Sequence, residues 1–214
     1  MPHPSTEVSR LREKQSTDRG RLDELLDATP LATVAFVRDG HPVALPTGIA
    51  RIGDELVIHG STGSPWLRHL AGGATASVCV TTLDGIVVAR SAFESSFRFR
   101  SAVLFGSFVQ VDGDAKVGYL QTLTDAFIPG RVAELRDSTA KELAATLVLG
   151  MPITADNWSL KVGEGWPEDD EADVAAGAWA GVVPIISGYG AALRAPDCPD
   201  SVPVPASVRA LVGE

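Results

Sequence analysis

The spacing of hydrophobic residues changes along the chain from a short helical pattern to a series of strand patterns. Apolar residues recur at helical spacing over residues 21–26, where Asp18 suits the N-cap and Pro30 ends the pattern. Short runs rich in β-branched and aromatic residues follow, and such runs predict strands. These runs cover residues 31–37, 41–51, 55–59, 75–83, 86–93, 101–111 and 148–162, and a last apolar run covers residues 179–186.

Glycine-containing turn signals separate several of these strands. Asp39-Gly40 and Asp84-Gly85 each lie between two strand patterns, so each predicts a hairpin turn. Gly53-Asp54 predicts a further turn. Pro42 and Pro46 lack backbone N–H donors, so we expect the strand that contains them at a sheet edge or a bulge.

Three further segments predict helices beside the strands. Ser64 suits an N-cap and Pro65 the first helical position, and Gly72-Gly73 ends the helix that starts there. Helical patterns also cover residues 115–127 and 139–147. Because helices do not alternate regularly with strands, the pattern predicts a mainly β fold (α+β) with peripheral helices, built as a small antiparallel barrel.

The domain organisation follows from where the patterned region begins and ends. Residues 1–19 are polar and predict an N-terminal arm, residues 20–190 predict the barrel domain, and the proline-containing residues 191–214 predict a C-terminal tail. The acidic run 168–171 lies in residues 164–176, which predict a solvated loop.

Composition narrows the classes of partner. The 214 residues contain 18 Lys+Arg and 27 Asp+Glu, a formal net charge of −9, which argues against broad binding of nucleic acid or anionic membranes. No apolar run approaches the roughly 18 residues of a membrane helix, and the polar start is unlike a signal peptide. Two cysteines cannot form a disulfide framework, so we expect a cytoplasmic protein.

Two segments carry candidate binding chemistry. At residues 58–64 a strand ends, hydroxyl residues and glycines cluster, and a helix begins; such a turn exposes N–H groups that suit a phosphate. An ordinary capped helix start is the alternative. Arg98 and Arg100 alternate with Phe97, Phe99 and Ser101 in a strand, so the two arginines share one face and could bind a phosphate or pair with carboxylates.

Residues 59–64, 81–93 and 100–101 resemble the pyridoxamine 5′-phosphate oxidase-like family, in particular its flavin-nucleotide-binding, nitroimidazole-reductase-like branch. The resemblance covers about residues 19–186 and implies an antiparallel split β-barrel that binds FMN at a homodimer interface. It also implies that residues 46–51 lie against the isoalloxazine. The residues that it implies for the FMN phosphate are His59, Ser61, Thr62, Ser64, Arg100 and Ser101.

The chain departs from the family pattern at four positions that matter for the cofactor. Pro65 replaces a basic residue, Ser95 a histidine, Phe99 a tyrosine and Gly163 an arginine. Each lost charge-assisted hydrogen bond would weaken phosphate binding by roughly 1.5–3 kcal/mol. The pocket could instead serve haem, with His59 as the first candidate ligand and His69 as the second, or no cofactor. No metal site is expected apart from His59 if haem binds.

Three hypotheses for function follow. The first is an FMN-type oxidoreductase that takes hydride from a nicotinamide nucleotide (NAD(P)H) and acts on a small organic molecule at a homodimer interface. The second is a split-barrel enzyme of specialised metabolism that has lost FMN. The third is a non-catalytic flavin-binding protein. No side chain is assigned a catalytic role from the sequence.

Overall fold

The computed structural model describes residues 4–213 and divides them into two compact units, each described here by itself. The first three residues of the predicted arm and the last residue of the predicted tail lie outside the described part. The first unit contains the described residues up to Thr47, together with Thr75–Gly106 and Ile153–Ile186. The second contains Gly48–Ala74, Ser107–Pro152 and the described residues from Ser187 onward.

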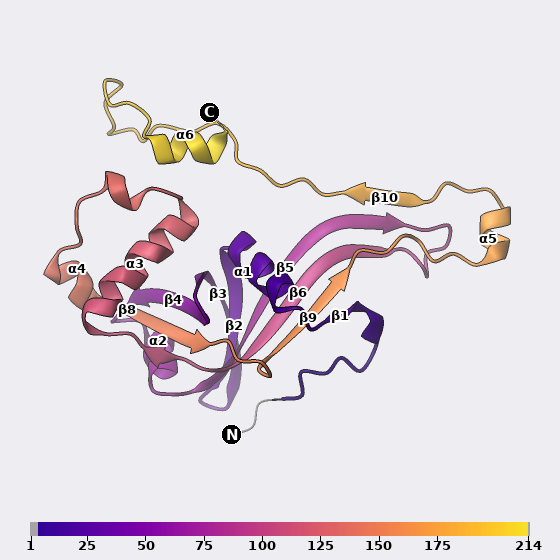
Figure 1. Cartoon of the computed structure of the whole chain (residues 1–214), viewed down its shortest axis with the longest axis horizontal. Coiled ribbons are helices and arrows are strands. Elements are labelled where there is room, and N and C mark those ends of the chain that lie inside the picture. Colours follow the sequence, from indigo (N-terminus) through magenta and orange to yellow (C-terminus); the bar gives the residue numbers. More distant parts are fainter. Residues whose placement is uncertain (1–3, 214) are drawn as a thin grey trace. The chain divides into compact units, whose positions relative to one another are not determined.

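The first unit is an antiparallel sheet with one helix on it. Its strand order is β1-β9-β6-β5-β2, and β10 pairs with β5 beyond the stretch that pairs with β2. Strands β5 and β6 are the longest, and Figure 1 shows them side by side. The elements are η1 (Arg12–Lys14), β1 (Gln15–Ser16), α1 (Arg19–Ala28), β2 (Leu31–Arg38), β5 (Thr75–Val88), β6 (Ser96–Ser107), β9 (Trp158–Gly163), α5 (Glu171–Ala175) and β10 (Gly181–Pro184).

The second unit combines a smaller antiparallel sheet with most of the helices. Strand β3 runs into it from the first unit, and the order within it is β3-β4-β8-β7. Its elements are β3 (His41–Ile52), β4 (Glu55–Ser61), α2 (Pro65–Ala71), β7 (Val109–Gln110), α3 (Gly113–Phe127), η2 (Val132–Glu134), α4 (Ala140–Ala145), β8 (Thr146–Pro152) and α6 (Ala206–Val212).

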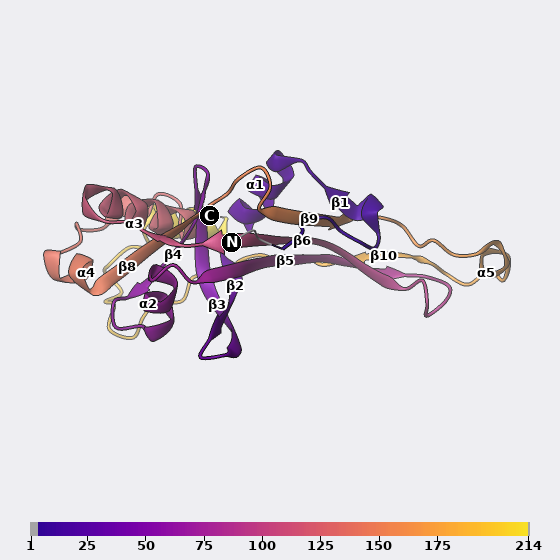
Figure 2. The ribbon, with the colours of Figure 1, turned by 90° about the horizontal axis from the view of Figure 1, so that it is seen from below.

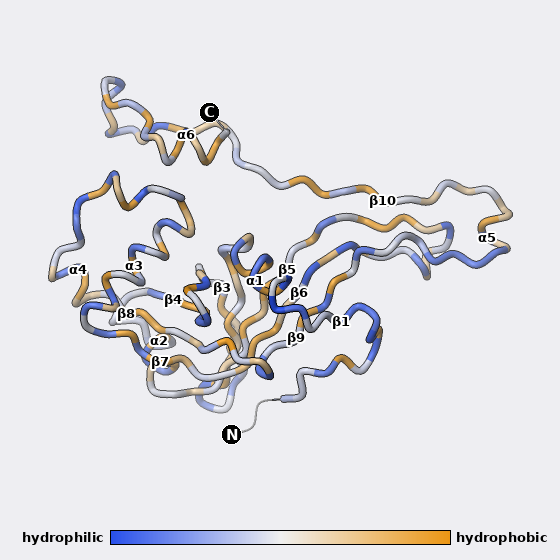
Figure 3. The backbone as a smooth tube through the Cα atoms, in the orientation of Figure 1, coloured by the Kyte–Doolittle hydropathy of each residue, from blue (hydrophilic) through white to orange (hydrophobic). Residues whose placement is uncertain are grey.

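Helix α1 provides the apolar cover of the first sheet. It begins where predicted, because the Asp18 carboxylate accepts a hydrogen bond from the Gly20 N–H at 2.8 Å. Leu22, Leu25 and Leu26 are fully buried, and each contributes roughly 1.5–3 kcal/mol of hydrophobic free energy. Figure 2 shows α1 over one face of β5 and β6. In Figure 3 the segment before α1 is mostly hydrophilic, whereas β2 is mostly hydrophobic.

Helix α3 covers the sheet of the second unit. Leu123 packs with Ala50, Val57 and Val148, which are all buried. Tyr119 adds a polar contact to this apolar cluster, since its hydroxyl donates to a Glu55 carboxylate oxygen at 2.6 Å. That bond raises the pKa of Tyr119, because it holds the phenol proton against a carboxylate.

Several local predictions are confirmed. Asp39 and Gly40 have φ of 53° and 77°, as a primed hairpin turn requires, and Gly53 also has a positive φ. Helix α2 begins at Pro65 as expected. The proline-containing strand is not an edge strand as a whole, because β3 lies between β2 and β4 in the strand order; the pairing with β4 begins at Ile49, so Pro42 and Pro46 lie outside it.

The predicted hairpin turn at Asp84-Gly85 is wrong, because β5 continues through it to Val88. Gly85 is not among the residues with a positive φ; it is the antiparallel partner of Pro184 in β10. A Cβ at Gly85 would lie 3.0 Å from the Val183 carbonyl oxygen. The glycine therefore permits close approach of a neighbouring strand rather than a turn.

The predicted strand over residues 148–162 is interrupted, so β8 ends at Pro152 and β9 begins at Trp158. The buried Asn157 side chain explains the break: its oxygen accepts from the Thr154 N–H at 2.8 Å, and its nitrogen donates to the Phe105 carbonyl at 2.9 Å. The helix predicted over residues 139–147 is also shorter, although Thr139 forms a capping box with Glu142.

Among the described residues, no helix is long and apolar enough to cross a lipid bilayer.

Candidate functional site

The hydroxyl-rich turn between β4 and α2 lies in the second unit. Gly60 is required there by packing, since a Cβ would lie 2.6 Å from a methyl carbon of the buried Leu67. The turn closes on itself: the Gly63 N–H donates to the Ser61 hydroxyl at 3.1 Å, and the Ser64 N–H donates to the Ser61 carbonyl at 2.9 Å. Glycine and serine thus shape a tight entry into α2.

The N–H groups of Thr62, Gly63 and Ser64 are already used, which corrects the expectation that the turn exposes them. The Thr62 N–H donates to the Ala145 carbonyl at 2.9 Å, and the two N–H groups that follow are bonded within the turn. Pro65 contributes no N–H at all. The Ser64 hydroxyl makes no cap bond, and within the described part the Thr62 hydroxyl has no hydrogen-bond partner. The turn can therefore offer hydroxyl groups to a ligand, but not the N–H groups of Thr62, Gly63 and Ser64.

His59 lies at the end of β4, opposite Val148 of β8. Its Nδ1 atom is buried and makes no hydrogen bond within the described residues. Burial lowers the pKa of His59, so the imidazole is neutral at neutral pH. A buried polar atom without a partner costs free energy, which makes this nitrogen notable as a ligand atom. His69 lies in the last turn of α2 and is only partly buried.

Arg100 and Ser101 lie in the first unit, on opposite faces of β6. Arg100 shares its face with Asp84 of β5, whose carboxylate accepts from Nε at 3.0 Å and from Nη2 at 2.9 Å. Ser101 points to the other face and lies 3.1 Å from the Thr81 hydroxyl. Since successive side chains of a strand alternate, a single phosphate beside this strand cannot contact both.

The Arg100–Asp84 pair changes the electrostatics on its face. The two hydrogen bonds from Arg100 lower the pKa of Asp84, and the same bonds raise the pKa of Arg100. The Thr82 hydroxyl donates to the same carboxylate at 3.4 Å. Both groups therefore stay charged, and part of the Arg100 guanidinium is already committed to a carboxylate.

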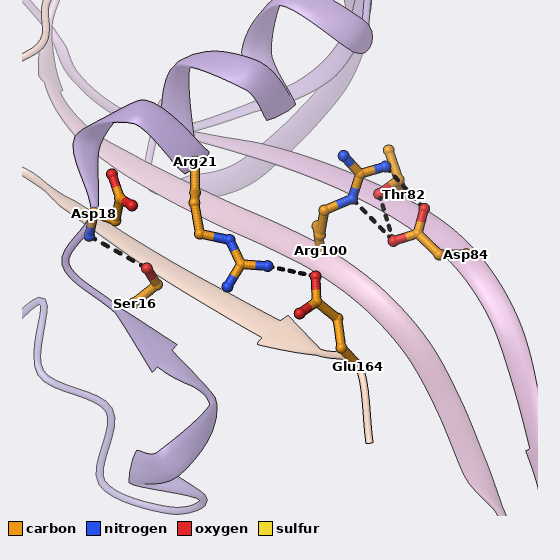
Figure 4. A network of polar contacts seen from close by, with 7 residues as sticks. All are labelled: Ser16, Asp18, Arg21, Thr82, Asp84, Arg100 and Glu164. Carbon is orange, nitrogen blue, oxygen red and sulfur yellow. Dashed lines mark hydrogen bonds and ion pairs between the residues drawn. The ribbon is translucent and has the colours of Figure 1, made fainter. Parts of the chain in front are cut away.

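A cavity of about 290 Å³ surrounds this pair in the first unit. Arg21 of α1 points across it to Glu164, which follows β9, and the two side chains form an ion pair (Figure 4). Figure 4 also shows the Arg100–Asp84 pair on the neighbouring strands. The charged residues that line the cavity are Arg21, Glu24, Asp84, Arg98, Arg100 and Glu164.

Sequence reasoning placed the two arginines of β6 on one face correctly, but it missed the other four charged residues of the cavity. Arg21 and Glu24 are three residues apart in a helix, and this spacing places them on one face. The sequence therefore contained enough information to predict that these two side chains lie together. Asp84 was assigned to a turn. Glu164 carries no local signal, because its partner lies 143 positions earlier in the chain.

A second polar contact of the first unit corrects the prediction of a solvated acidic loop. The Asp169 side chain is only 1% exposed. It accepts from the Arg90 backbone N–H at 2.6 Å and from Arg90 Nη1 at 2.9 Å, and Arg90 Nε donates to the Ala178 carbonyl at 3.0 Å. One residue of the acidic run is thus buried and, through Arg90, connects residues 169–178 to the end of β5.

Comparison with known proteins shows the family of the chain. The family model described as pyridoxamine 5′-phosphate oxidase matches residues 18–157. No curated protein matches the chain.

Among solved structures, the FAD and haem binding protein from Mycobacterium smegmatis is 68% identical, with a TM-score of 0.91, over 93% of this chain and 97% of that one. The flavocytochrome Anf3 from Azotobacter vinelandii is 35% identical, with a TM-score of 0.89, over 96% of this chain and 95% of that one.

A Bacteroides thetaiotaomicron protein with a proposed role in 5-nitroimidazole antibiotic resistance is similar in fold. It is 15% identical, with a TM-score of 0.58, over 69% of this chain and 86% of that one. Together the comparisons confirm the predicted architecture, an antiparallel split barrel that is mainly β with peripheral helices.

Proposed function

Because the chain belongs to the pyridoxamine 5′-phosphate oxidase-like family, we propose that it is a redox protein that holds both a flavin nucleotide and a haem. The similarity to a FAD and haem binding protein carries this proposal, since 68% identity extends over almost the whole of both chains. Flavin and haem were alternatives in the sequence interpretation, and the proposal places them together. We propose FAD rather than FMN as the flavin.

The residues of the hydroxyl-rich turn fit a phosphate group through hydrogen bonds rather than charge. The Thr62 and Ser64 hydroxyls are available donors, and the Ser61 hydroxyl, which accepts from Gly63, still has its proton to donate. We therefore propose Ser61, Thr62 and Ser64 as phosphate ligands. Arg100 and Ser101 remain candidates, and their opposite directions allow only one of them to serve a given phosphate.

His59 fits an iron ligand on two grounds. Burial favours the neutral imidazole, and a histidine binds iron through a ring nitrogen that carries no proton. Its Nδ1 atom is also buried without a partner in the described part of the chain, so a bond to iron would satisfy it. We propose His59 as the haem ligand and His69 as the second candidate. When bound, a flavin supplies hydride and single-electron transfer and a haem supplies single-electron transfer.

We propose that the protein is a homodimer that accepts electrons from a reduced nicotinamide nucleotide and passes them to a small molecule. The uncovered face of the first sheet supports a second copy as its partner. Leu31 and Val37 of β2 and Leu83 of β5 are 59%, 62% and 47% exposed on the face opposite α1. Light scattering coupled to size exclusion tests the subunit number.

The absorption spectrum of the purified protein tests the cofactor proposal. We expect a Soret band together with flavin absorbance, and we expect FAD rather than FMN in the acid extract when it is separated by chromatography. Colourless protein that takes up neither added FAD nor added hemin would refute the proposal. A flavin without a Soret band, before or after adding hemin, would refute the haem half.

Two matched variants distinguish the candidate iron ligands. His59→Ala should lose the Soret band and keep the flavin, whereas His69→Ala should keep both. The reverse result would assign the iron to His69. Reduction of the bound flavin by NADH or NADPH without oxygen, followed by turnover with an artificial electron acceptor, separates a catalyst from a non-catalytic flavin-binding protein.

A further inference from the structure

The charged cavity of the first unit contains more groups than its two ion pairs use. Three guanidinium groups and three carboxylates line it, so the formal charges cancel. The two ion pairs engage two groups of each sign. Glu24 and Arg98 remain, one of each sign, and both line the same cavity of about 290 Å³.

Glu24 is a carboxylate whose two oxygens are uncommitted. It lies on α1 three residues after Arg21, so the two side chains share one face of the helix. Within the described residues it makes no hydrogen bond and no ion pair. Its charge reaches the cavity nonetheless, because it helps to raise the pKa of Arg100. A positively charged ligand group would therefore find an acceptor here.

Arg98 is a guanidinium fixed in place by neutral groups. Its Nε donates to the Gly165 carbonyl at 3.1 Å, and its central carbon lies 4.9 Å from the centre of the Trp166 ring. Within the described part of the chain it forms no ion pair, and its two terminal nitrogens have no hydrogen-bond acceptor. A guanidinium held in this way presents parallel N–H donors that match a carboxylate.

Among the described residues that line the cavity, the two ion pairs leave one unpaired group of each sign, Glu24 and Arg98, to select a ligand. Arg100 and Asp84 are joined by two hydrogen bonds of 3.0 and 2.9 Å, so neither group is easily taken by a ligand. An anion bound to Arg98 would share the cavity with the negative charge of Glu24, and a cation bound to Glu24 would share it with the positive charge of Arg98. A ligand that carries both charges meets both groups favourably and leaves the cavity neutral.

We propose that this cavity binds a small zwitterion, with an ammonium group on Glu24 and a carboxylate group on Arg98. The cavity of about 290 Å³ lies just below the roughly 300–1,000 Å³ typical of ligand pockets, so it suits a molecule of amino-acid size. The chain's net charge of −9 also disfavours a free anion. The proposal uses residues of the first unit alone and does not depend on the proposed cofactors.

Titration calorimetry on the purified protein with its native cofactors tests the proposal. The probes are glycine, β-alanine, γ-aminobutyrate and 5-aminovalerate, a series in which the distance between the charges grows. Butyrate and n-butylamine are the singly charged controls. We expect one member of the series to bind saturably and about tenfold more tightly than either control. No saturable binding of any zwitterion at millimolar concentration, or equal binding of the controls, would overturn the proposal.

Variants connect the binding to the two residues. Glu24→Gln and Arg98→Gln should each weaken binding of the best zwitterion about tenfold. Glu24→Gln should remove the advantage of the zwitterion over butyrate, and Arg98→Gln should remove its advantage over n-butylamine. Glu13→Gln and Arg12→Gln, in the exposed turn η1, should bind as the unmodified protein does. Arg98→Lys keeps the charge and should retain part of the affinity if Arg98→Gln does not fold. Unchanged binding in both Glu24→Gln and the Arg98 variant would refute the assignment.

Discussion

The ring of Phe99 covers the backbone of Gly163, its antiparallel partner across β6 and β9: a Cβ on Gly163 would lie 2.9 Å from Cε1 of the ring. The family pattern has a tyrosine and an arginine at these two positions. In this chain the phenyl ring fills the space that a Cβ at position 163 would need, so the glycine is required by the packing of its partner.

Gly163→Ala should destabilise the protein by about 1–3 kcal/mol, because the added methyl group overpacks against the Phe99 ring. Chemical denaturation followed by tryptophan fluorescence measures the change. In a Phe99→Leu background the same substitution should cost less, since a leucine vacates part of the space. Equal costs in the two backgrounds would mean that the residues do not act together.

Asp169→Ala should lower the free energy of unfolding by about 3–5 kcal/mol, because it removes the charge partner of Arg90 and leaves Nη1 and the Arg90 backbone N–H without their acceptor. The control is Asp170→Ala: this neighbour is exposed and its side chain makes no cap bond. Denaturation midpoints of the two variants decide the prediction, which fails if both shift equally.

The contact between Glu134 and α6 should weaken in acid. The Ser207 hydroxyl and N–H donate to the Glu134 carboxylate, and they lower its pKa from 4.5 to about 2. A lowered pKa stabilises the contact fully above about pH 4.5, and the stabilisation is lost as the pH falls toward about 2. Carboxyl chemical shifts in an NMR titration follow this group.

Ser207→Ala provides the control for that titration. It removes the hydroxyl bond and should raise the pKa of Glu134 toward its ordinary value, while Arg131 still donates to the same carboxylate oxygen, Oε2, at 3.0 Å. A Glu134 pKa near 4.5 in the unmodified protein would contradict the prediction.

Thr62→Val and Ser64→Ala should each weaken flavin binding if the hydroxyl-rich turn holds a phosphate. Loss of one hydrogen bond to a charged group costs roughly 1.5–3 kcal/mol, or about 10–150-fold in dissociation constant. Flavin fluorescence during dialysis reports the affinity. Thr122→Val, on an exposed position of α3 where the hydroxyl bonds only to Gly118, is the matched control and should bind flavin normally.

Local signals predicted those parts of the fold that short segments determine. Asp39-Gly40 makes the expected turn because both residues adopt positive φ between strands that pair with each other. The same dipeptide at Asp84-Gly85 does not form a turn, since β10, about 100 positions later, pairs with it and the strand continues to Val88. Pairing over such a distance leaves no trace in the local pattern.

Of the two candidate binding regions, the sequence predicted the one made of contiguous residues and missed the one assembled from distant segments. The turn at residues 61–64 was predictable, because its hydroxyls, glycine and helix start are contiguous. The charged cavity was not, since its residues come from four separate elements and the ion pair of Arg21 with Glu164 joins distant parts of the sequence. Charge type alone does not tell which of many acidic residues an arginine meets.

The ion pair between Asp169 and Arg90 secures a long connection without a covalent bond. Many proteins secure a long connection with a cystine bridge, which opens when the surroundings become reducing. Here the ion pair of Arg90 with Asp169 secures the connection at the end of β5, and both cysteines are free thiols. The connection that leads into β10 is thus held without a disulfide, so a change in the thiol–disulfide balance does not release it.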